Sequence, residues 1–152
     1  MKSSKLTILG LVLALLTLVL AACGSETAVP NTSAVDLNAE TTVVPVEGGT
    51  YTDVSAAGLA VMLENKDFPL INVHIPYEGE IESTDEFVPF NEIEAYLDKF
   101  PADKSAQVVV YCRSGSMSGQ AAQALVKLGY TNVWNLDGGM RAWENSSQTL
   151  IK

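Results

Sequence analysis

A short run of β-branched residues, followed at once by glycine and serine, constrains the fold of this chain most strongly. Residues 107–111 have the sequence Q-V-V-V-Y, without the polar alternation of a half-exposed strand, so a strand buried on both faces of a parallel sheet is expected. A Gly/Ser loop follows over residues 112–118, and a helical pattern runs from Gln120 to Leu128 and ends at Gly129. A buried strand that passes through a short loop into a helix is typical of α/β proteins.

Helical and strand patterns alternate on both sides of this run. Asp53 or Ser55 can cap a helix, and an apolar strand follows over residues 70–73. Another strand is expected over residues 133–136, before a turn at residues 137–139 with the sequence D-G-G. This alternation predicts an α/β fold with a central, mostly parallel sheet and helices on both faces.

One further helix is predicted from a capping box and an apolar stripe. Asn91 followed by Glu94 matches the capping-box pattern. Four apolar residues stand at positions i, i+3, i+4 and i+7 of this segment and would share one helix face: Ile93, Tyr96, Leu97 and Phe100. The pattern predicts an α-helix with one buried face.

The N-terminal residues have the layout of a secretory signal. Residues 1–5 carry two lysines and no acid, and residues 6–20 contain no charge. The sequence L-A-A-C, which ends at Cys23, closely matches the lipobox of bacterial lipoproteins. This resemblance implies cleavage before Cys23 and a diacylglyceryl thioether on its sulfur. Acyl chains contribute about 0.8 kcal/mol per buried CH₂, so two or three of them would anchor the protein without a spanning helix. The alternative is an uncleaved signal anchor.

Three segments are therefore expected. Residues 1–22 form the lipoprotein signal peptide, residues 23–49 the lipidated cysteine and a flexible tether, and residues 50–152 the domain. The tether is predicted because its Ser, Thr, Ala, Asn and Pro follow no helical or strand period. An extra edge strand at residues 41–44 is the alternative. The domain would be extracytoplasmic, held by lipid at the bacterial outer membrane or cell surface.

The charge balance argues against one class of partner. The chain carries 9 basic and 18 acidic residues, and removal of residues 1–22 takes away two lysines and no acid. Such an acidic protein is not expected to bind nucleic acid, which repels it. With Cys23 occupied by lipid, Cys112 is the only free thiol in an oxidising compartment, where cysteines usually pair.

Cys112 and the loop after it are the candidate site. Open α/β sheets bind ligands at the carboxyl ends of their strands, where this loop lies. Backbone N–H groups of the loop and the N-terminus of the next helix would stabilise a thiolate or an anion there. Gly115 permits the tight backbone that such a loop needs. The alternative is an inert, buried cysteine.

Several stretches of the sequence resemble the rhodanese family. They are V-V-V-Y-C-R-S-G-S-M-S at residues 108–118, A-L-V-K-L-G-Y-T-N-V-W-N-L-D-G-G-M-R-A-W at residues 124–143, and L-I-N-V-H at residues 70–74. The resemblance covers nearly all of the domain and implies a single rhodanese-like domain.

What the resemblance implies is sulfurtransferase chemistry at Cys112. Its thiolate would take the outer sulfur of a thiosulfate-like donor, hold it as a persulfide and pass it to a thiol, a cyanide-like acceptor or an acceptor protein. No metal and no organic cofactor is needed. The expected substrate-binding loop consists of Arg113, Ser114, Gly115, Ser116, Met117 and Ser118.

The chain departs from the family pattern at three positions. Many members have Asp and Arg where this chain has Asn72 and His74, and a second basic residue where it has Met117. Such a base would bind an anionic donor. His74 is either a local proton carrier or a hydrogen-bonded structural residue, and Arg113 is either a source of positive charge or an outward-facing brace.

Two other functions compete with sulfur transfer. Phosphatases and arsenate reductases of this fold use a Cys-x₅-Arg loop, but Ser118 stands where that arginine would be. Without a guanidinium to hold a phosphoryl group, phosphatase chemistry is not expected. The second alternative is a non-enzymatic rhodanese module that acts as a persulfide carrier, a redox sensor or a protein-binding domain.

The lipid anchor can be tested at Cys23. Cys23→Ser removes the thiol that the lipid would occupy, so we expect an uncleaved or soluble protein without lipid. Incorporation of labelled fatty acid into the protein measures this, and unchanged incorporation in the variant would contradict the anchor.

Overall fold

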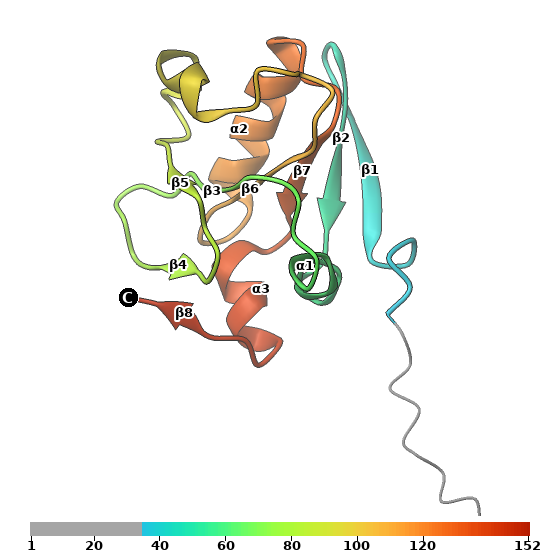
Figure 1. Cartoon of the computed structure of the whole chain (residues 1–152), viewed down its shortest axis with the longest axis vertical. Coiled ribbons are helices and arrows are strands. Elements are labelled where there is room, and N and C mark those ends of the chain that lie inside the picture. The colour runs from blue at the N-terminus through green and yellow to red at the C-terminus, as the bar shows by residue number, and fades with distance from the viewer. Residues whose placement is uncertain (1–34) are drawn as a thin grey trace, which may run out of the picture. The chain divides into compact units, whose positions relative to one another are not determined.

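In the computed structural model, which describes residues 35–152, strands and helices alternate along the chain (Figure 1). The strands are β1 (Thr41–Val46), β2 (Gly49–Val54), β3 (Leu70–Asn72), β4 (Glu80–Ile81), β5 (Glu86–Phe87), β6 (Val108–Tyr111), β7 (Val133–Leu136) and β8 (Leu150–Ile151). The helices are α1 (Ala56–Leu63), the 3₁₀ helix η1 (Ile93–Lys99), α2 (Ser116–Lys127) and α3 (Gly139–Asn145). Within that range, every helix falls short of the length and hydrophobicity needed to span a bilayer. The predicted signal peptide, Cys23 and the first part of the predicted tether lie outside the described residues.

Six strands form the central sheet, in the order β1-β2-β7-β6-β3-β5. All neighbouring pairs are parallel except β1 and β2, which are antiparallel. Side chains of α2 and η1 form one hydrophobic core with the sheet, and side chains of α1 and α3 form a second core on the other face. The predicted α/β fold, with a mostly parallel sheet and helices on both faces, is therefore confirmed. The remaining strands, β4 and β8, pair antiparallel with each other.

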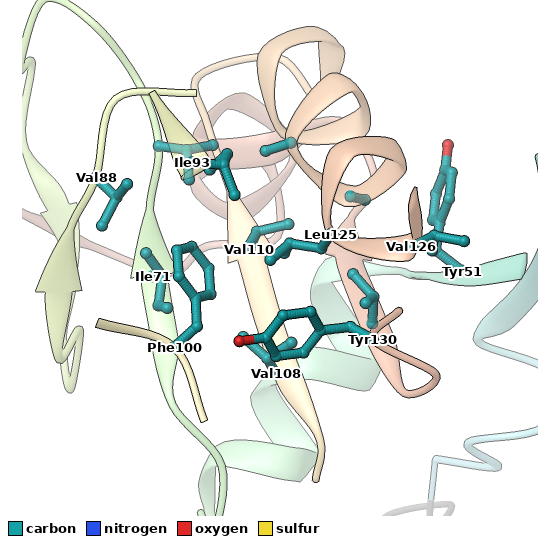
Figure 2. Close-up of a cluster of buried hydrophobic side chains, with 14 of the residues drawn as sticks. Tyr51, Ile71, Val88, Ile93, Phe100, Val108, Val110, Leu125, Val126 and Tyr130 are labelled. Carbon is teal, nitrogen blue, oxygen red and sulfur yellow. The ribbon is translucent and has the colours of Figure 1, made fainter. Parts of the chain in front are cut away.

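β6 lies inside the sheet and supplies side chains to both cores. Val108 and Val110 belong to the cluster that α2 covers (Figure 2). Val109 and Tyr111 belong to the cluster formed with α1 and α3, and all four residues are 0% exposed. The strand buried on both faces that the sequence predicts is thus confirmed. Because successive side chains alternate between faces, Cys112 returns to the α2 side.

The structure corrects the C-terminal part of the tether that composition predicts over residues 23–49. β1 pairs with β2 along its whole length, which is the edge strand weighed as the alternative. Val44 and Val46 pack against the core, whereas Val43 is 64% exposed. This alternation of buried and exposed side chains stabilises β1 as a half-buried strand. The folded domain therefore begins before residue 50.

η1 replaces the α-helix predicted from the capping box. Its N-cap is Glu92, which makes no side-chain capping bond, and Tyr96 has a non-helical backbone with φ −120° and ψ 32°. Because this kink breaks the helical period, the predicted apolar stripe does not form. Ile93 and Phe100 are buried, but Tyr96 is 36% and Leu97 38% exposed.

Tyr111, the last residue of β6, joins the sheet to the loop that carries β4. Its hydroxyl accepts a hydrogen bond from the backbone N–H of Ile81 at 3.0 Å and shares another with Thr84 Oγ1 at 2.7 Å. Burial raises the pKa of Tyr111 to about 12, so the hydroxyl stays protonated at neutral pH. Tyr111 and Ile81 are both 0% exposed, which makes these bonds costly to lose.

Tyr111→Phe should lower the free energy of unfolding by about 1–3 kcal/mol, because it leaves the buried N–H of Ile81 without its acceptor. Urea denaturation followed by fluorescence measures the loss. Tyr96→Phe is the matched control because Tyr96 is partly exposed, and its transition should stay within about 0.5 kcal/mol of the wild type. Equal midpoints for both variants would contradict the role given to Tyr111.

Candidate active site

Cys112 follows β6 directly and begins the tight connection to α2. Only 1% of its surface is exposed. Gly115 is the N-cap of α2 and adopts a left-handed conformation, with φ 87° and ψ −20°. Side chains with a Cβ are disfavoured in this region, which confirms the role that the sequence predicts for Gly115.

α2 begins at Ser116, before the start predicted at Gln120. Ser116, Met117 and Ser118 therefore belong to the first turn of the helix and not to a loop. The sequence misleads here because small polar residues are common both in loops and at helix N-termini, where backbone groups lack partners. The loop itself consists of Arg113, Ser114 and Gly115.

Two donors point at the sulfur of Cys112. The backbone N–H of Gly115 lies 3.1 Å from Sγ, and Ser118 Oγ lies 3.4 Å from it. The Ser118 hydroxyl is also within 3.2 Å of the Gly115 carbonyl oxygen, so its proton is shared between two acceptors. The N–H groups of the first turn of α2 have no intrahelical acceptor, and the helix dipole adds positive potential there. Such donors can stabilise an anionic group bound at this position.

The Gly138–Gly139 turn holds the loop from the side of α3. The N–H of Met140 donates to the Cys112 carbonyl at 2.9 Å, and the N–H of Arg141 donates to the Arg113 carbonyl at 3.0 Å. A Cβ on Gly139 would stand 2.2 Å from the Cys112 carbonyl oxygen, so only glycine fits. The sequence predicts this turn, but not its direct contact with Cys112. The feature of the sequence that could have indicated this contact is the pair of consecutive glycines after a buried strand.

The other predicted site residues make no hydrogen bond to the sulfur within the described part of the chain. Arg113, Ser114 and Ser116 are exposed, and Met117 is half-buried against the core under α2. Arg113 forms an ion pair with Glu78, in which Nη1 lies 3.1 Å from a carboxylate oxygen. This pairing agrees with the brace foreseen for Arg113. The substrate-binding role of Arg113, Ser114, Ser116 and Met117 stays a prediction.

Asn72 and His74 lie beside the site at the end of β3. The register pairs Asn72 with Tyr111, so His74 lies level with the loop. Asn72 braces this connection, because its side chain donates to the Gly79 carbonyl at 3.0 Å and accepts from the His74 N–H at 3.0 Å. His74 is 6% exposed, and its Nε2 lies 3.3 Å from Glu78 Oε2. That contact lacks hydrogen-bond geometry, and neither ring nitrogen has a hydrogen-bond partner among residues 35–152.

A family comparison agrees with this arrangement. Residues 62–146, more than half of the chain, match the family model of the rhodanese-like domain. The chain belongs to the rhodanese-like domain family. The match spans β3, the loop after Cys112, α2 and the Gly138–Gly139 turn, which confirms the resemblance seen in the sequence.

Similar proteins include named sulfurtransferases. A sulfurtransferase of Allochromatium vinosum is 35% identical over 93 residues, which cover 59% of this chain and 84% of that protein. Thiosulfate sulfurtransferase PspE of Escherichia coli is 36% identical over 70 residues, which cover 45% of this chain and 67% of that protein. The crystal structure of a rhodanese-related protein from Thermoplasma volcanium matches with a TM-score of 0.56 at 22% identity, over 65% of this chain and 96% of that one. This last similarity supports the fold alone.

Ser118→Ala should slow the alkylation of Cys112 in this rhodanese-like domain by roughly fivefold, because the reacting thiolate loses one of its two donors. The second-order rate with iodoacetamide at neutral pH measures the effect. Ser116→Ala removes an exposed hydroxyl of the same helical turn that makes no bond to the sulfur, so its rate should equal that of the wild type. Equal rates in both variants would show that Ser118 does not support the thiolate.

Proposed function

We propose that this protein is a membrane-anchored, extracytoplasmic sulfurtransferase that carries sulfane sulfur as a Cys112 persulfide. The observation that carries the proposal is the position of Cys112 Sγ, 3.1 Å from the Gly115 N–H at the N-terminus of α2. Family membership supports the same chemistry, since relatives named sulfurtransferases are about one third identical to this chain.

In the first half-reaction, the Cys112 thiolate attacks the outer sulfur of a donor such as thiosulfate. A new S–S bond forms to Cys112, the S–S bond of thiosulfate breaks, and its electron pair leaves with sulfite. The persulfide keeps the negative charge on its outer sulfur. The first-turn N–H groups of α2, which have no intrahelical acceptors, are the donors available to stabilise that charge.

In the second half-reaction, a nucleophile attacks the outer sulfur of the persulfide. The S–S bond to Cys112 breaks, and its electron pair returns to Sγ, so the thiolate is regenerated. Gly115 N–H and Ser118 Oγ, which contact Sγ in the resting structure, stabilise the departing thiolate. With cyanide as the acceptor, the product is thiocyanate.

The proposed compartment rests on the N-terminal sequence. The signal-like residues 1–22 and the lipobox at Cys23 support export and lipid attachment. Cys112 is the other cysteine of the chain, and its burial limits pairing with foreign thiols in an oxidising compartment.

A non-enzymatic persulfide carrier or redox sensor is the second candidate. It is favoured by the 1% exposure of Cys112, which limits the access of a donor to the sulfur. A protein partner that opens the loop would then control loading. The number of turnovers separates this candidate from an enzyme.

Treatment of the purified protein with thiosulfate should add the mass of one sulfur atom to the peptide that contains Cys112. Subsequent cyanide should release thiocyanate over many cycles, and Cys112→Ser should abolish both reactions because it lacks the nucleophile. Peptide mass spectrometry and thiocyanate release measure the two steps. One loading without repeated turnover would favour the carrier, and no added sulfur would refute the proposed sulfurtransferase.

A further inference from the structure

A groove with a volume of about 320 Å³ lies beside the active-site loop. One side is lined by Arg113, the residue next to the nucleophile, and another by Arg141 and Glu144 of α3. Lys152, which follows β8, also lines the groove. The groove is open to solvent, and its walls carry both signs of charge.

The basic residues of this groove differ from the other bases of the domain. The chain has nine Lys and Arg, of which Lys2 and Lys5 precede the described residues and seven remain. Five of these seven have partners: Lys66 with Asp85, Lys99 with Glu86, Lys127 with Glu47, Arg113 with Glu78, and Lys104 with the Leu128 carbonyl. Within residues 35–152, only the side chains of Arg141 and Lys152 have neither an ion pair nor a hydrogen bond, and both line this groove.

Glu144 adds an unpaired negative charge to the same groove. No cation of the described residues pairs with it, whereas the other acid of the groove, Glu78, is engaged by Arg113. The groove thus offers two free cations and one free carboxylate in a chain with a formal net charge of −9. A ligand that carries both a carboxylate and an ammonium group would satisfy all three.

The groove adjoins the active-site loop through backbone hydrogen bonds. Arg141 donates its N–H to the Arg113 carbonyl at 3.0 Å, and its neighbour Met140 donates to the Cys112 carbonyl at 2.9 Å. Arg141, whose side chain would bind an anion, therefore lies just after the Gly138–Gly139 turn that contacts the active-site loop. The groove therefore lies directly beside the loop that begins at Cys112.

We propose that this groove binds the charged head of the sulfur acceptor, and that the acceptor is a small amino-acid thiol such as cysteine. The inference rests on the proposed function and adds to it the class of acceptor. The thiol sulfur forms a bond to the outer sulfur of the Cys112 persulfide, and the bond from that sulfur to Cys112 breaks. Its electron pair returns to Cys112 as the thiolate, and the thiol proton passes to the new small-molecule persulfide. Arg141 and Lys152 bind the carboxylate, and Glu144 binds the ammonium group.

Single-turnover transfer tests the acceptor class. The full chain is loaded with thiosulfate, freed of donor and mixed with cysteine or with cysteamine, which lacks the carboxylate. Cysteine should react roughly tenfold faster than cysteamine, as expected for a charge-assisted contact. Arg141→Gln together with Lys152→Gln should reduce this ratio to about twofold or less. Lys127→Gln, which removes a base paired with Glu47 outside the groove, should keep the full ratio.

A binding measurement that needs no loaded sulfur complements the kinetics. S-methylcysteine keeps the charged head but cannot accept sulfur, and NMR titration should shift the backbone amides of residues 140–144. The Arg141→Gln, Lys152→Gln double variant should lose these shifts. If thiosulfate does not load Cys112 but the amide shifts appear, the binding site in the groove is supported and the proposed function is refuted. Equal rates for cysteine and cysteamine in the loaded wild type would overturn the acceptor assignment and leave the proposed function intact, and absent shifts would overturn the groove itself.

Discussion

The close approach of Gly139 to the carbonyl of Cys112 is the constraint on which the site depends. A Cβ at this position would lie 2.2 Å from the carbonyl oxygen, so any other residue would push the turn away from the loop. With glycine there, the N–H groups of Met140 and Arg141 bind the carbonyls of Cys112 and Arg113. These carbonyl oxygens are directed toward α3. The Gly115 N–H faces the sulfur instead.

The electrostatics of the site come from dipoles more than from charged side chains. Within the described residues, the groups hydrogen-bonded to Cys112 Sγ are a backbone N–H and a hydroxyl. Arg113 is neutralised by Glu78, and Met117 packs against the core where a base would bind a donor. The N–H and hydroxyl donors contact Sγ directly, whereas carboxylates elsewhere in this acidic chain are screened by solvent and salt. Free positive charge is available in the neighbouring groove, from Arg141 and Lys152.

The parallel sheet brings three distant segments to one edge. β3, β6 and β7 are neighbours, so the segments that follow them carry His74, Cys112 and the Gly138–Gly139 turn to the same end of the sheet. Each strand is short and almost wholly buried, which leaves little freedom for its register. The position of Cys112 is therefore fixed by packing on both faces. The exposed loop residues are free to vary without disturbing it.

Local patterns in the sequence were enough to predict β6, β7, a helix cap at Asp53 or Ser55, of which the structure uses Ser55, the tight backbone at Gly115 and Cys112 as the candidate nucleophile. Each of these depends on the chemistry of a few adjacent residues: an unbroken β-branched run, a side chain that caps a helix, or a glycine at a tight turn. Tertiary structure decided the rest. β1 became a strand because β2 offered an edge, and the stripe in η1 was lost to a kink at Tyr96. The Arg113–Glu78 pair and the groove with Arg141 and Lys152 join residues far apart in the sequence. Such contacts leave no periodic signal in a single chain, since charged residues on a surface follow no rule of spacing until the fold places them side by side.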